Sequence, residues 1–173
     1  MMTKPYNVIL GGLEIPYGAA AGLSQSYEDV NGGRSLRRAA SGAPIIQTAW
    51  RKWRTTLVGS GRLPPGLASL DYDAAMSLHC AAPMEVSTAS TTATLPSARR
   101  SDFPPIGYAV VNGEYVRTAI SIVVDTVTFA AVAGASRYVV VYFPVLTVVA
   151  TSRPRTNFDA RGVVVGWELT LEE

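Results

Sequence analysis

The alternation of apolar and polar residues along this chain predicts short strands and little helix. The clearest pattern is at the end of the chain, where two sets of alternating residues would occupy opposite faces: Val163, Val165, Trp167, Leu169 and Leu171, against Val164, Gly166, Glu168, Thr170 and Glu172. A period of two is typical of a half-buried antiparallel strand. We therefore expect this last strand to complete a sheet begun by residues 8–80.

Turn signals in the middle of the chain predict β-hairpins. Asn112-Gly113 and Asp125-Thr126 each separate two strand-like runs, and Asn-Gly readily adopts the positive φ angles of a two-residue hairpin turn. A further turn at 133–136 leads into another apolar run. Residues 106–143 are therefore expected to form several short strands, either as a small β-sandwich or as an inserted subdomain.

The first half of the chain also reads as strands, which we expect at 8–15, 23–30, 36–40, 45–58 and 76–80. The Asn31-Gly32-Gly33 turn makes 36–40 the strand that returns along 23–30. Threonine, valine and two tryptophans favour one long strand over a helix in 45–58. Helix is expected at most in 67–75, after the turn Leu63-Pro64-Pro65-Gly66, or in part of 45–54.

Two segments between these regions are less regular. Residues 85–98 are rich in serine, threonine and alanine, and this composition is typical of either a solvated strand or a linker. Residues 99–105 contain two adjacent prolines and are expected to form an irregular connection.

The composition favours a subunit of an assembly. Only 16% of the 173 residues are charged and 48% are hydrophobic, whereas a typical domain has about 25% charged residues. Little of the surface can therefore be charged, which suggests burial by other chains; the alternative is a compact β domain with a serine, threonine and alanine surface. Residues 1–62 hold eight basic and three acidic side chains, and this asymmetry suits head-to-tail packing of identical subunits.

The same features argue against several other classes of protein. A net charge of +2 is too small to indicate nucleic-acid binding. The single cysteine excludes an intramolecular disulfide, and no run is long enough and apolar enough for membrane insertion. The first residues do not resemble a signal peptide, so we expect a soluble chain made in the cytosol without processing.

Candidate catalytic residues are few. His79 and Cys80 are neighbours on an expected strand and would point to opposite faces, so a nucleophile pair is not expected. Asp71 and Asp73 could bind a cation or act as an acid–base pair, although a solvated turn is the simpler interpretation. We predict no catalytic, cofactor or metal site and no enzyme; the alternative would be a wall hydrolase using Asp71, Asp73 or Glu85.

The best candidate binding residues are Trp50, Arg51, Trp53 and Arg54, which lie together with Lys52. Tryptophan and arginine dominate many protein interfaces. The same residues could stack on bases or sugars and neutralise phosphates. A third interpretation is that one tryptophan is buried in the core and the basic side chains extend to solvent.

Several segments together resemble tail-tip proteins of long, flexible-tailed (siphovirus-type) bacteriophages. The resemblance covers most of the chain and is carried by 11–16 (GGLEIP), 24–29 (SQSYED), 47–72 (QTAWRKWRTTLVGSGRLPPGLASLDY), 95–116 (LPSARRSDFPPIGYAVVNGEYV) and 158–173 (FDARGVVVGWELTLEE). The distal tail protein is the nearest comparison. The resemblance implies a mostly β fold, a tail-tube-like β-sandwich or split barrel with little helix. Residues 1–95 plus 145–173 would form the ring domain and 97–143 an inserted β subdomain.

The resemblance also implies a function. The chain would be a structural virion protein that forms a ring, a hexamer or alternatively a trimer, at the distal end of the tail. Its partners would be identical subunits, the tail tube, the baseplate hub and fibre proteins, with assembly in the host cytoplasm and no cofactor. The alternative is a receptor- or carbohydrate-binding module of the tail tip, in which Tyr108, Tyr115, Tyr138 and Tyr142 stack on sugars.

Overall fold

The protein is mostly β, as the sequence predicts. The computed structural model describes residues 7–30, 32–61 and 65–173. Strands make up 54% and helix 4%, and the strands form several antiparallel sheets. In the described part of the chain the helical segments are two 3₁₀ turns, η1 (Tyr17–Ala19) and η2 (Leu67–Ser69). The candidate helix at 67–75 is therefore only η2, and the candidate at 45–54 is not helical.

The chain forms two compact units. Unit 1 comprises the described residues up to Ile9 together with Ser77–Leu146, and unit 2 comprises those of Leu10–Met76 and Thr147–Glu173. The chain passes from one unit to the other within three strands: β1 (Ile9–Leu10), β7 (Met76–His79) and β15 (Val145–Ala150). The sequence had instead suggested a division near residues 95 and 145.

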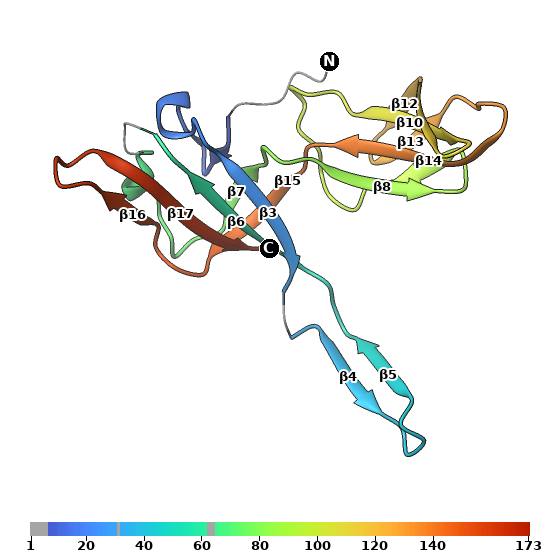
Figure 1. Cartoon of the computed structure of the whole chain (residues 1–173), viewed down its shortest axis with the longest axis horizontal. Helices are drawn as coiled ribbons and strands as arrows, with labels where there is room; N and C mark the ends of the chain where they lie inside the picture. The colour runs from blue at the N-terminus through green and yellow to red at the C-terminus, as the bar shows by residue number, and fades with distance from the viewer. Residues whose placement is uncertain (1–6, 31, 62–64) are drawn as a thin grey trace. The chain divides into compact units, whose positions relative to one another are not determined.

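The sheet of unit 2 is built around the C-terminal strand β17 (Val164–Glu172). One edge of β17 pairs with β6 (Trp53–Gly59), and β6 in turn pairs with β3 (Ser24–Asp29) (Figure 1). The other edge pairs with β16 (Arg155–Phe158) and with the end of β15. The short strand β2 (Leu13–Glu14) follows a turn in which Gly11 and Gly12 both have positive φ.

Trp167 is the buried tryptophan of unit 2, with 2% of its surface exposed. Its indole Nε1 donates a hydrogen bond to the carbonyl oxygen of Ala19 at 2.7 Å. Gly59 lies directly opposite on β6, and a Cβ there would come within 2.4 Å of the indole. Glycine at this position therefore lets the large ring lie flat against the neighbouring strand.

The sequence predicted which side chains of the last strand point to the core, and this prediction is confirmed in the second half of the strand and wrong in the first half. Trp167, Leu169 and Leu171 are buried, as expected. Val164 is buried as well, whereas Val163 and Val165 are 41% and 58% exposed. The register between β16 and β17 shifts at this point, and a bulge of this kind reverses which side chains face the core.

The single strand predicted for residues 45–58 is two strands, β5 (Pro44–Thr48) and β6. The strand predicted at 36–40 is β4 (Arg34–Arg38), which pairs with β5 and not with β3. Because β3 already pairs with β6, the chain between them forms its own hairpin. Val30 N–H donates to Lys52 O, and Ala49 N–H donates to Gly33 O, which links the two ladders. Asn31 of the first predicted turn, and Leu63 and Pro64 of the second, lie outside the described residues.

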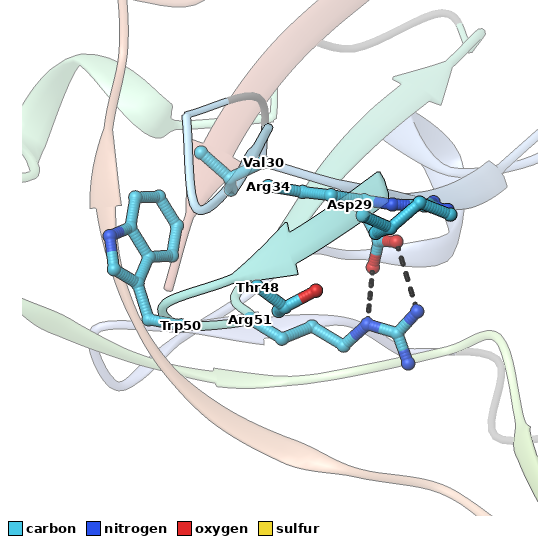
Figure 2. A pocket seen from close by; sticks show the side chains of 7 residues that line it. Asp29, Val30, Arg34, Thr48, Trp50 and Arg51 are labelled. Atoms are coloured by element: carbon cyan, nitrogen blue, oxygen red, sulfur yellow. Dashed lines mark hydrogen bonds and ion pairs between the residues drawn. The ribbon is translucent and has the colours of Figure 1, made fainter. Parts of the chain in front are cut away.

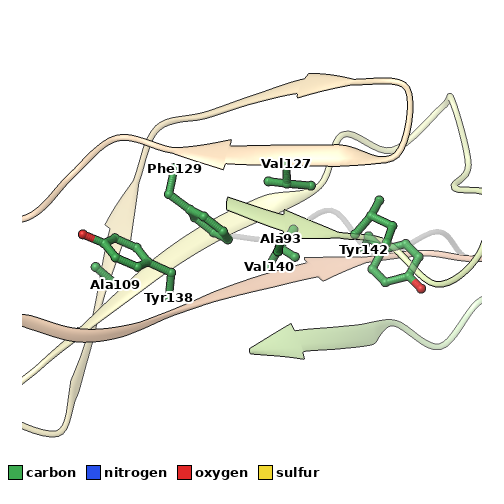
Figure 3. Packing of buried hydrophobic residues seen from close by; sticks show 8 residues of the cluster. Ala93, Ala109, Val127, Phe129, Tyr138, Val140 and Tyr142 are labelled. Carbon is green, nitrogen blue, oxygen red and sulfur yellow. The ribbon is translucent and has the colours of Figure 1, made fainter. Parts of the chain in front are cut away.

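Unit 1 contains two sheets that share one core. The larger has the order β11 (Glu114–Thr118), β10 (Ile106–Val111), β14 (Ala135–Tyr142), β8 (Met84–Thr88), and the smaller β12 (Ile120–Val123), β13 (Thr126–Phe129), β9 (Thr92–Thr94). Figure 3 shows side chains of both sheets meeting, and the buried members of this core are Ala93, Leu95, Ala109, Val127, Phe129, Tyr138, Val140 and Tyr142.

Both hairpins predicted in this unit are confirmed. Asn112 and Gly113 have φ angles of 52° and 86° and connect β10 to β11. The second turn lies one residue earlier than predicted, since Val123 pairs with Thr126 and leaves Val124 and Asp125 in the loop. Residues 85–98 contribute β9 and most of β8, so this segment is paired strand and not linker.

Candidate interaction surface

The β4–β5 hairpin, residues 34–48, is an exposed two-stranded element that we call the arm. All ten residues of its two strands are exposed. A two-stranded hairpin is at best marginally stable in water unless a further surface covers it. The arm therefore has the character of an element that is stabilised by binding.

The register of the arm gives it two different faces. Residues directly opposite in an antiparallel pair share a face. One face carries Leu36 beside Ile46, with Arg34–Thr48 and Arg38–Pro44 on either side, and we call it the apolar face. Leu36 and Ile46 are 62% and 52% exposed. The opposite, polar face carries two pairs, Ser35–Gln47 and Arg37–Ile45.

A small pocket lies where the arm joins the sheet, and it includes two residues predicted as interface. Its volume is about 190 Å³, and its lining consists of Asp29, Val30, Arg34, Ile46, Thr48, Trp50 and Arg51. Figure 2 shows the indole of Trp50 at one end and the ion pair between Arg51 and Asp29 at the other. Trp50 is 46% exposed and so continues the apolar surface beyond the arm.

Glycine explains why Trp50 can lie close to the turn before the arm. A Cβ on Gly33 would come within 2.2 Å of the Trp50 carbonyl oxygen and 2.7 Å of its indole ring. The absence of a side chain at Gly33 thus leaves room for the tryptophan. The other tryptophan of the predicted interface, Trp53, is half-buried and makes an edge-to-face contact with Tyr27, with ring centres 6.3 Å apart.

The basic residues of the predicted interface are paired within the chain. Arg51 contacts Asp29 at 3.3 Å, and Lys52 contacts Glu173 at 3.8 Å. Arg54 lies between two glutamates on neighbouring strands, Glu172 and Glu28. The Arg54 guanidinium donates hydrogen bonds to Glu172 and to Glu28, and these bonds, the one to Glu172 most, raise the pKa of Arg54 above its ordinary value. These pairs neutralise the cluster, which weighs against the interpretation that it binds phosphates.

The structure brings Trp50 and Arg51 together in the pocket but places Trp53 and Arg54 farther along β6. It also adds three residues that the sequence had not indicated: Arg34, Leu36 and Ile46. Leu36 and Ile46 are apolar residues that each lie five positions from Ser41, but this signal becomes visible only once β4 and β5 are known to pair. The assignment of an interface remains a prediction.

The carboxylates proposed as a catalytic alternative lie on a turn. The Asp73 N–H donates to Asp71 Oδ1 at 3.0 Å, and both residues line a cavity of about 360 Å³ together with Arg153. Between them, the Tyr72 hydroxyl donates to Leu67 O at 2.6 Å, and burial raises the pKa of this phenol. Over the described residues, no three acidic, histidine or cysteine side chains gather as metal ligands would.

The remaining candidate residues lie in unit 1. The Cys80 thiol is buried and His79 is half-buried, while Glu85 is exposed. Of the four tyrosines proposed to stack on sugars, Tyr138 and Tyr142 are 6% and 0% exposed and belong to the core, so that prediction is wrong for these two.

Unit 1 also contains a buried arginine that the sequence did not indicate. Arg100, 2% exposed, lies in the segment predicted to be an irregular connection. Its guanidinium donates to Asn7 O at 2.8 Å, to Cys80 O at 3.2 Å and to both carboxylate oxygens of Asp102. The hydrogen bonds from Arg100 hold the pKa of Asp102 below its ordinary value. These contacts indicate a structural role.

No protein-family model matches this chain, and no curated protein matches it significantly. Across the described residues, none of the helical segments has the length and hydropathy needed to cross a bilayer.

Proposed function

We propose that this protein is a structural subunit of a bacteriophage tail tip that assembles with copies of itself into a ring, a hexamer or a trimer. The observation that carries the proposal is the apolar face of the arm. A side-by-side pair of large aliphatic residues on a hairpin without covering partners is costly to leave in water, and a second chain would remove it from water. The resemblance to distal tail proteins supplies the viral context.

Charge complementarity favours a second copy as the chain that covers the arm. Residues 33–49 carry three arginines and no acidic residue. The other described residues of unit 2 carry nine acidic and six basic side chains. A basic arm and an acidic body on the same subunit attract each other between copies.

Such a contact joins two different surfaces of identical subunits. Contacts of this head-to-tail type form closed rings when the rotation between neighbours closes, as the proposed function requires. The tail tube would adjoin one side of the ring, and the baseplate hub and fibre proteins the other. The protein would then reside in the virion after assembly in the host cytoplasm.

The test is the mass of the assembly for two matched double variants, measured by mass photometry. Leu36→Glu with Ile46→Glu places two carboxylates on the apolar face, and Ser35→Glu with Gln47→Glu places two on the polar face. We expect the wild-type chain and the polar-face variant to form a closed ring. We expect the apolar-face variant to dissociate, since a central interface residue contributes about 2 kcal/mol or more, roughly 30-fold in association.

Circular dichroism of the apolar-face variant must match the wild type, which separates lost assembly from lost folding. A wild-type chain that stays monomeric at tens of micromolar and is absent from purified tail particles would contradict the proposed function. Equal assembly of both variants would contradict the role of the apolar face.

A further inference from the structure

The outer face of the larger sheet of unit 1 carries aromatic and basic residues that the proposed function does not use. Tyr108 on β10 lies opposite Arg117 on β11, and Val110 lies opposite Tyr115 in the same pair of strands. On the other side of β10, Val110 lies opposite Arg137 of β14. We call Tyr108, Tyr115, Arg117 and Arg137 the platform.

The alternation along the strands shows that the platform faces away from the core. Ala109, Tyr138 and Val140 occupy the intervening positions of β10 and β14, and all three belong to the buried core (Figure 3). Successive side chains of a strand point to opposite faces of the sheet. The four platform residues therefore share the solvent side.

The two tyrosines of the platform hold each other in place. Their ring centres are 5.8 Å apart and the rings are nearly perpendicular, at 89°. Tyr115 nevertheless remains 57% exposed. An edge-to-face pair of this kind orients a ring before a ligand arrives, which reduces the entropy lost on binding.

The arginines of the platform have no partners within the described residues. Neither Arg117 nor Arg137 makes a side-chain hydrogen bond or ion pair there, and both are exposed. In unit 2, by contrast, Arg51, Lys52 and Arg54 are each paired with a carboxylate. Of the two acidic residues in the strands of this sheet, Glu114 is opposite Val111 and so lies on the other face, whereas Glu85 on the far strand β8 is opposite Val141 and lies on the platform face.

We propose that the platform binds a saccharide that carries a carboxylate. The exposed ring of Tyr115 offers an apolar surface to the C–H face of a sugar, and the phenol hydroxyls of Tyr108 and Tyr115 are available to its hydroxyl groups. The planar fork of an arginine matches a carboxylate in two parallel hydrogen bonds. A negatively charged ligand also complements the two unpaired cations.

The face is less suited to other partners. Val110 and Val139 beneath the platform are only 5% and 3% exposed, so little apolar surface remains for a protein interface. Binding a single nucleic-acid strand depends on a basic groove that follows successive phosphates, and two arginines on either side of a tyrosine pair do not form one.

The test is binding of the full chain to an array of carboxylate-bearing oligosaccharides, such as galacturonate and glucuronate oligomers, each paired with its methyl ester. Esterification removes the charge and keeps the sugar. We expect an acidic member to bind and its ester to bind at least about tenfold more weakly, with weaker binding at higher salt. Tyr115→Ala and the pair Arg117→Gln with Arg137→Gln should each lower the affinity about tenfold.

Two exposed residues of unit 2, Tyr17 and Arg161, provide matched controls. Tyr17→Ala and Arg161→Gln remove a tyrosine and an arginine side chain from positions outside the platform, and they should leave binding unchanged. The proposal is overturned if no acidic oligosaccharide binds more tightly than its ester, if Tyr115→Ala binds as the wild type does, or if an oligothymidylate binds more tightly than every saccharide. Each of these results can occur whether or not the chain forms a ring, so the proposed function is tested separately.

Discussion

The most specific prediction concerns the ion pair between the buried Arg100 and the carboxylate of Asp102. Asp102→Ala removes two hydrogen bonds, at 3.0 and 2.6 Å, from a guanidinium that is 2% exposed. The remaining contacts of Arg100 are to two carbonyl oxygens and to the ring of Phe103, 5.2 Å from its centre. The variant thus keeps a buried cation and removes its negative partner.

The expected loss follows from these contacts. Each hydrogen bond to a charged group contributes about 1.5–3 kcal/mol, so the two together set an upper bound of roughly 3–6 kcal/mol. The carboxylate of Asp102 is 49% exposed and is therefore partly screened by water. We expect Asp102→Ala to lower the free energy of unfolding by about 2–3 kcal/mol, between a surface pair and a fully buried one.

Urea denaturation followed by circular dichroism measures this change. Asp125→Ala is the control, because Asp125 is an exposed acidic residue of the same unit whose side chain makes no hydrogen bond or ion pair in the described residues. Adding Arg100→Met to Asp102→Ala should cost less than the sum of the two single changes, since the buried charge is then gone. An Asp102→Ala protein as stable as the Asp125→Ala control would refute the reasoning.

Three further predictions concern stability. Arg100 lowers the pKa of Asp102 below its ordinary value of 3.8, so the stabilisation that the ionised carboxylate gives to the folded state is present above that pH and is lost as the pH falls through the lowered pKa. The difference in unfolding free energy between the wild type and Asp102→Asn should therefore shrink only below about pH 4. Trp167→Ala should cost about 3–5 kcal/mol in urea denaturation, and Trp50→Ala, at 46% exposure, clearly less; equal costs would contradict the assignment of Trp167 to the core. Gly59→Ala should lower the free energy of unfolding by about 1–3 kcal/mol, and with it the melting temperature, because the added Cβ would overlap the Trp167 indole. An unchanged melting temperature would show that the ring can move.

Features set by neighbouring residues could be predicted from the sequence. The Asn112-Gly113 hairpin was predicted because its turn depends on two residues that accept positive φ, and both adopt it. The burial of Trp167, Leu169 and Leu171 was predicted because alternation along a regular strand needs no knowledge of the partner strand. The mostly β character of the chain followed from many such local patterns.

Features set by pairing between distant residues could not be predicted in this way. The bulge at Val165 reverses the facing of the strand because of its register with β16, and Tyr138 is buried while Tyr108 is half-exposed because they occupy opposite faces of one sheet. Arg100 is in the core although its segment reads as an exposed connection, since Asn7 O, Cys80 O and Asp102 satisfy its charge.

The candidate surfaces divide in the same way. The sequence by itself determined that the chain is rich in strands and poor in charge, and that tryptophan and arginine are concentrated at residues 50–54. Only the tertiary structure decided that these cations are already paired, and that Leu36 and Ile46 form one exposed apolar face. It also decided which tyrosines face solvent. The physical reason is that exposure and pairing depend on which strands become neighbours, and that choice is made by contacts between residues far apart in the chain.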